Sequence, residues 1–132
     1  MLSGPRATYN RIATSLSMAV KAGAMIHQGG IVVAEGGFAT SGRAALALTA
    51  MGMATETIDN TTGADGDQKV QVEKGCFLYA NSAADPVGVA SLNQSVFIED
   101  DETVSATDDG GARSPAGVCF DVDDTGVWVR FT

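Results

Sequence analysis

The sequence has few of the residues that build catalytic sites. It contains one histidine, His27, one tryptophan and only 6% aromatic residues. His27 has no cysteine or carboxylate beside it in the sequence, so a surface histidine is a better interpretation than a general base. No Gly-x-Ser-x-Gly elbow occurs, and the aromatic residues are too few to build a sugar platform around a carboxylate pair such as Glu99 and Asp101. We therefore expect no catalytic residues and no enzyme activity.

The two cysteines, Cys76 and Cys119, do not form a recognisable site. They lack C-x-x-C spacing and histidine companions, which excludes zinc and thioredoxin-type chemistry. Each precedes a phenylalanine, so we expect two small apolar core residues. A disulfide between them is the less favoured alternative, because a single pair is not a disulfide framework. No cofactor is expected.

Long apolar runs and basic clusters are also missing. No segment approaches the length of about eighteen apolar residues that a membrane-spanning helix needs, and residues 16–20 are too short for a signal-peptide core. We therefore expect an intracellular product without a membrane partner. The net charge of −8 argues against a nucleic-acid partner, because neutralising phosphates requires clustered Lys and Arg.

The charge is distributed unevenly along the chain. Arg6, Arg11 and Lys21 precede the first acid, Glu35, so residues 1–34 carry +3 and the rest carries −11. Residues 1–15 contain Gly4-Pro5 and show no sustained period, which predicts an extended N-terminal arm. The remainder, residues 16–132, is predicted to be a single β-rich domain. Such an arm is suited to reaching an acidic patch on a neighbouring subunit.

Short apolar runs separated by glycine predict many short strands. Sixteen glycines and three prolines fit the tight turns of a β-sandwich or barrel. The apolar density peaks between residues 69 and 101, where we place the core. The predicted strands are 16–20, 25–26, 31–33, 70–73, 76–79 and 96–98, followed by a terminal hairpin of 116–122 and 127–131.

Residues 43–54 fit a helix or a strand; we favour a strand buried on both faces and continued by Thr55, Thr57 and Ile58. In the terminal hairpin, alternation places Val127 with the inward side chains and Trp128 on the opposite face. We expect Trp128 to fill core space, the alternatives being stacking on Arg130 or a subunit contact.

Four acidic clusters interrupt the strands, at residues 59–67, 99–102, 108–110 and 121–126. The last has the opening spacing of a calcium loop, but the position that needs glutamate is Thr132. Solvated turns explain all four clusters, with Asp109-Gly110 and Thr125-Gly126 supplying left-handed residues. No metal site is expected, and weak cation binding stays the alternative.

The order of several motifs resembles a known family. The motifs are Val20-Lys21-Ala22-Gly23, Gly29-Gly30-Ile31-Val32, Ile58-Asp59-Asn60 followed by residues 63–67, residues 70–77, Asn81-Ser82-Ala83, residues 96–104, and the stretch from Ala116-Gly117 to Trp128-Val129. Their order and spacing resemble the capsid cement (decoration) proteins of tailed bacteriophages. The resemblance covers about residues 20–131 and leaves the arm outside it.

The resemblance implies a β-barrel or jelly-roll-like sandwich that binds the exterior of an expanded capsid. The implied partners are the major capsid protein and copies of the chain itself, with a homotrimer favoured and a homodimer possible. The implied location is the virion, after synthesis in the cytoplasm of the host bacterium. Charge and predicted disorder, not the resemblance, suggest the arm residues that contact the capsid or another copy: Pro5, Arg6, Tyr9, Asn10 and Arg11.

Two other functions stay open from the sequence. A phage spike or fibre-base module would also be β-rich and oligomeric, and the turns at 59–67 and 105–112 would form its receptor-binding tip. An enzyme with an unrecognised acid pair is the other alternative, tested by the variant Asp101→Asn.

Overall fold

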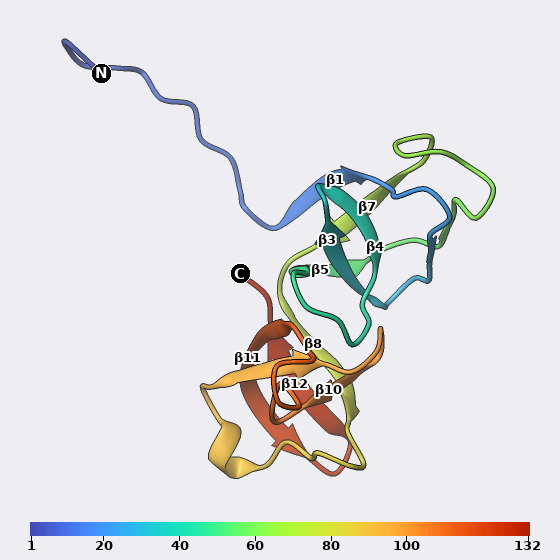
Figure 1. The fold of residues 1–132 in the computed structure, drawn as a ribbon. Coiled ribbons are helices and arrows are strands. Elements are labelled where there is room, and N and C mark those ends of the chain that lie inside the picture. The colour runs from blue at the N-terminus through green and yellow to red at the C-terminus, as the bar shows by residue number, and fades with distance from the viewer.

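The computed structural model describes residues 1–132 and consists almost entirely of short strands (Figure 1). The elements are β1 (Ser15–Ala19), β2 (Met25–Ile26), β3 (Ile31–Glu35), β4 (Phe38–Ser41), β5 (Thr49–Ala54), β6 (Ile58–Asp59), β7 (Lys69–Glu73), β8 (Cys76–Asn81), the 3₁₀ turn η1 (Val89–Ser91), β9 (Ser95–Ile98), β10 (Thr103–Ser105), β11 (Pro115–Asp123) and β12 (Gly126–Arg130). None of its helical structure has the length and hydrophobicity that a membrane crossing requires.

Ten of the strands form an open sheet and a closed barrel, and β2 pairs with β6 in a separate two-stranded sheet. The open sheet has the order β1-β7-β5-β3-β4, and the barrel has the order β10-β8-β12-β11-β9. All neighbours in the barrel are antiparallel except β8 and β10, which run parallel. In Figure 1 the sheet lies above the barrel. The predicted all-β fold containing a small barrel is therefore confirmed.

Strand β3 is a wall shared by two hydrophobic cores. Successive side chains of a strand point to opposite faces, and all of the first three residues of β3 are buried. Ile31 and Val33 pack into the barrel core, whereas Val32 packs into the core of the sheet. The prediction that the core is centred on residues 69–101 was too narrow, since both cores draw on β3 and the barrel core also contains the terminal hairpin.

The chain passes from the sheet to the barrel at Lys74-Gly75. The predicted strands on either side of Gly75 are confirmed as β7 and β8. They do not pair with each other, because β7 lies in the open sheet and β8 in the barrel. The other predicted strands, at 16–20, 25–26, 31–33 and 96–98, correspond to β1, β2, β3 and β9.

The prediction for residues 43–54 was wrong in its first half. Only residues 49–54 form a strand, and this strand is not buried on both faces. Ser114 pairs two backbone groups of the preceding loop: its hydroxyl donates to the Ala45 carbonyl (2.7 Å) and accepts from the Leu48 N–H (3.1 Å). Because these groups are paired across the fold, the loop needs neither a helix nor a ladder.

Residues 55–58 do not continue β5, contrary to the prediction. Ile58 and Asp59 form the separate strand β6, which pairs with β2. Left-handed geometry in the turns is confirmed at Asp109 (φ 53°) and Gly110 (φ 69°). In the β11–β12 turn only Gly126 has positive φ, so the expectation for Thr125 was wrong.

The terminal hairpin forms as predicted, but Trp128 does not fill the core. Val127, Val129 and Phe131 are buried, and Arg130 is exposed. Trp128 is half-buried on the outer side of the barrel, where it pairs across the ladder with Leu78. The period of two fixes this side, because Val127 and Val129 occupy the interior.

Candidate functional site

The N-terminal arm, residues 1–14, projects from the body as an extended segment (Figure 1). All five residues predicted as contacts, Pro5, Arg6, Tyr9, Asn10 and Arg11, are exposed and lie outside any strand. The only tether within residues 1–14 is the Thr14 carbonyl, which accepts from the Lys74 N–H at 2.8 Å. Strand β1 begins at Ser15, the residue predicted as the last of the arm.

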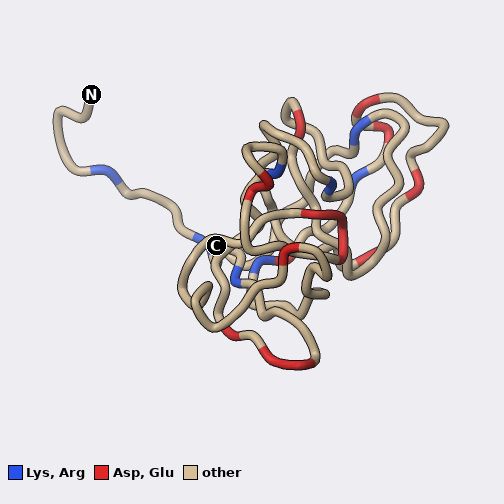
Figure 2. The backbone as a smooth tube through the Cα atoms, turned by 60° about the horizontal axis from the view of Figure 1, so that its bottom comes forward, with Lys and Arg blue, Asp and Glu red and all other residues tan.

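The arm carries apolar as well as basic side chains. Leu2, Tyr9 and Ile12 are exposed, and Tyr9 is 97% exposed. Its charged residues are Arg6 and Arg11, while acids cluster in the turns of the body (Figure 2). The arm is thus an unpartnered segment opposite in charge to the surface of the body.

Lys21 does not add to the basic character of the arm, although it was counted with it. Its ammonium group lies 3.0 Å from a carboxylate oxygen of Glu35, and Arg43 lies 2.9 Å from the other oxygen. The hydrogen bonds from Arg43 and Lys21 lower the pKa of Glu35 to about 2. The two cations and this carboxylate therefore form a local ion-pair cluster on the sheet.

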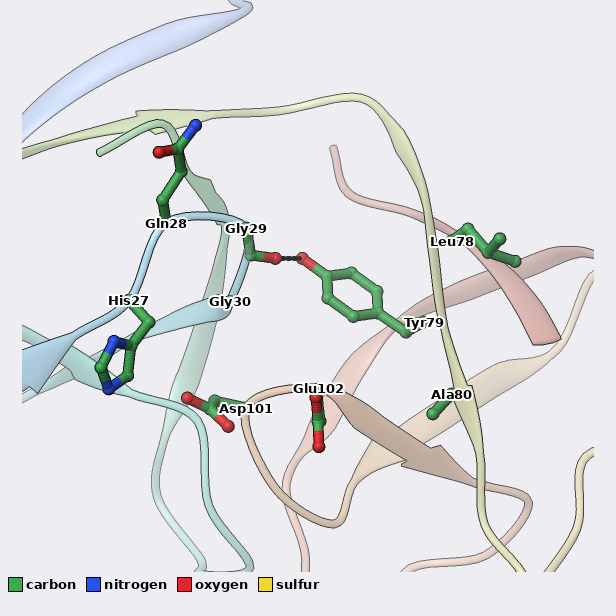
Figure 3. A pocket seen from close by; sticks show the side chains of 9 residues that line it. All are labelled: His27, Gln28, Gly29, Gly30, Leu78, Tyr79, Ala80, Asp101 and Glu102. Carbon is green, nitrogen blue, oxygen red and sulfur yellow. Dashed lines mark hydrogen bonds between the residues drawn. The ribbon is translucent and has the colours of Figure 1, made fainter. Parts of the chain in front are cut away.

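A pocket of about 500 Å³ lies where the β2–β3 loop meets the barrel (Figure 3). His27, Asp101 and Tyr79 are among its lining residues. The Tyr79 hydroxyl donates to the Gly29 carbonyl at 2.9 Å, and burial, helped by the nearby Asp101 charge, raises its pKa. The hydroxyl thus joins the barrel to the sheet as a fixed donor, and no serine, threonine or cysteine lines this pocket.

The pocket brings together residues that the sequence analysis treated separately. His27 is exposed, as predicted, and shares the pocket with Asp101 from the β9–β10 turn. The backbone explains this proximity, since the Ile31 N–H donates to the Asp101 carbonyl at 2.8 Å. No sequence signal links these positions, because the contact depends on the packing of the sheet against the barrel.

The acidic clusters form turns whose carboxylates bind the backbone nearby. Asp59 accepts from the N–H and hydroxyl of Thr61 (3.0 and 2.6 Å), and Asp123 accepts from the same two groups of Thr125. These hydrogen bonds lower the pKa values of both carboxyls. The turn geometry is accounted for by these side chains, and no group of three or more potential metal ligands is assembled.

Asp85 organises a longer loop in the same way. Its carboxylate accepts from the Thr107 N–H and hydroxyl (3.0 and 2.6 Å) and lies 3.2 Å from Arg113. These contacts, led by the Thr107 hydroxyl, lower the pKa of Asp85. The turn at 105–112, considered above as a receptor tip, is therefore tied to the loop before η1.

The cysteines differ from each other, contrary to the expectation of two core residues. Cys119 is buried in the barrel core, whereas Cys76 is exposed at the start of β8. They are not bonded to each other. The physical reason is the pleat of β8, which turns Tyr79 inward and leaves Cys76 and Leu78 outside.

We define the outer barrel face as Cys76, Leu78, Phe120, Asp121 and Trp128. Trp128 pairs with Leu78 on one side and Asp121 on the other. A bulge in β11 between Cys119 and Asp121 leaves Phe120 63% exposed. A shallow hollow of about 340 Å³ lies between Cys76, Phe120, Asp121 and Trp128.

The position of Trp128 on this face follows from strand alternation, but the residue pattern gives no sign of the bulge that turns Phe120 outward.

Comparisons of the chain with models of known protein families, with curated proteins and with solved structures found no match.

Proposed function

We propose that the chain is a structural cement protein that binds the outside of a phage head and stabilises contacts between major capsid protein subunits. The observation that carries the proposal is the projecting arm, whose apolar and basic side chains have no partner within the chain. The order of motifs that resembles capsid cement proteins supports the same assignment.

The arm supplies binding free energy only when something covers it. Burying one large apolar side chain contributes about 1.5–3 kcal/mol, and Tyr9 and Ile12 are respectively 97% and 81% exposed. Ordering the extended segment opposes this gain. Each copy therefore binds modestly, and repetition over a shell supplies the remaining strength through multivalency.

The body supplies a rigid base for such an arm. The shared wall β3 and the Tyr79–Gly29 hydrogen bond hold the sheet and the barrel together. The partners in this proposal are the major capsid protein and further copies of the chain, with a trimer favoured over a dimer. Pro5, Arg6, Tyr9, Asn10 and Arg11 are the proposed contact residues.

The test is a deletion of residues 1–12, which retains Ala13 and Thr14 because Thr14 bonds Lys74. The truncated body should keep its circular dichroism spectrum and melting temperature but no longer co-sediment with expanded heads. The substitution Thr8→Ser, which keeps the arm's length and charge and lies outside the proposed contact residues, serves as the matched control and should still bind. Heads decorated equally by the truncated chain would refute the role of the arm.

Electron cryo-microscopy of decorated heads separates the proposal from its alternative. A cement protein covers the shell in many copies, whereas a spike or fibre-base module occupies few vertices. Finding the protein at the vertices alone would favour the receptor-binding module.

A further inference from the structure

The outer barrel face and the N-terminal arm are two uncovered apolar surfaces of one chain. On the face, Phe120 is 63% exposed and Leu78 is 41% exposed. On the arm, Tyr9 and Ile12 are exposed still further. A contiguous patch of exposed large apolar side chains commonly marks an interaction site.

The charges of the two surfaces are opposite. Strands β8, β11 and β12 and the turn between the last two carry the acids Asp121, Asp123 and Asp124 and a single base, Arg130. The arm carries Arg6 and Arg11 and no acid. The arm complements the acids of this side of the barrel in charge and its uncovered rings in apolar character.

The spacing of the arm residues matches the hollow in the face. In an extended segment residues two apart point to the same side, so Tyr9 and Arg11 face one surface together. The hollow is lined by Cys76, Phe120, Asp121 and Trp128. A tyrosine ring in the hollow would pack against Phe120 and Trp128. The guanidinium two residues later would then lie near Asp121.

We propose that the outer barrel face binds the N-terminal arm of a second copy of this chain, with Tyr9 in the hollow and Arg11 beside Asp121. The arm leaves its own body at Thr14 and runs away from its own barrel (Figure 1). To reach its own face the arm would have to fold back from the turn at Ala13-Thr14. A second copy needs no reversal.

The proposal is tested in solution, without capsids, so its failure is distinguishable from failure of the cement assignment. Sedimentation velocity of the full chain over a concentration series should show self-association. Tyr9→Ser and Phe120→Asp should each weaken association at least tenfold. Tyr9 is 97% exposed, so Tyr9→Ser leaves folding intact even if the other variant were to unfold. Leu46→Asp is the control, since Leu46 is 61% exposed but lies outside the face.

Mixing the two variants decides whether the contact is between copies. Phe120→Asp keeps an intact arm and Tyr9→Ser keeps an intact face. An equimolar mixture should therefore form a heterodimer, although each variant alone stays largely monomeric. A wild-type chain that stays monomeric, self-association that survives both substitutions, or a mixture that stays monomeric would each overturn the proposal.

Discussion

Gly52 on β5 occupies a backbone position that residues with a side chain fit poorly. Its φ is +141°, a conformation that residues with a side chain rarely adopt. A Cβ at this position would also lie closer than 3.0 Å to the backbone carbonyl oxygen of Glu73 on β7. Backbone cannot move aside as a flexible side chain does, so Gly52→Ala must strain β5 or separate it from β7.

The cost of Gly52→Ala follows from two contributions. Holding a non-glycine residue in such a conformation costs about 1–3 kcal/mol, and forcing extra atoms into a packed site typically costs about 1–3 kcal/mol more. The two contributions sum to about 2–6 kcal/mol, and we expect a loss near the middle of this range, about 4 kcal/mol, in the free energy of unfolding. For a domain of this size that corresponds to a fall of roughly 10 °C or more in melting temperature.

Two other glycines serve as matched controls for the same substitution. Gly36 has φ +58° with open space around it, so Gly36→Ala should cost only the conformational term of about 1–2 kcal/mol. Gly88 has φ −128°, and a Cβ added there would meet no other part of the protein within 4 Å, so Gly88→Ala should be nearly neutral.

Urea denaturation followed by circular dichroism measures all three. If Gly52→Ala is no more destabilising than Gly36→Ala, the argument from close strand approach is wrong.

Three further predictions concern side chains. Tyr79→Phe removes the hydrogen bond to Gly29 and should lower the free energy of unfolding by about 1 kcal/mol in urea denaturation. An unchanged urea midpoint would show that this bond does not stabilise the fold. Asn60→Ala removes the hydrogen bonds that its buried amide donates to the Lys21 and Ala64 carbonyls (2.9 and 3.0 Å) and should cost about 1–3 kcal/mol, whereas Thr61→Ala nearby should cost less. Glu35 has a pKa lowered from 4.5 to about 2, so its stabilising contribution is complete above pH 4.5 and is lost as the pH falls through 2. The variant Glu35→Gln should therefore lose less stability than the wild type between pH 5 and pH 2. The same dependence of stability on pH in both proteins would contradict the ion-pair assignment.

The residue pattern was sufficient for most of the strands because their signals are local. Alternation at Val70 and Val72 and the glycine pair after β3 predict a strand and a hairpin whatever the rest of the chain does. The inward side of β12 followed from its period of two. The exposed, extended arm was recognisable for the same reason, since it contains no periodic apolar pattern that could bury it.

Strand β10 shows the limit of local signals in the barrel. Only Val104 is apolar in this three-residue strand, yet β10 closes the barrel by pairing with β8 and β9. A strand this short gains its stability from partners on both sides and not from its own sequence. The loop before β5 is a similar case, because the hydroxyl of Ser114, far along the chain, pairs two of its backbone groups.

The sequence by itself determined the all-β class, the positions of most strands, the acidic turns and an arm that carries basic charge. Only the tertiary structure decided that β3 separates two cores, that Lys21 is neutralised by Glu35, and that Phe120 and Trp128 share an outer face with a hollow. The physical reason is range: strand periods and turn residues act over a few neighbours, whereas a shared wall, an ion pair and a bulge depend on which segments the closed barrel brings together.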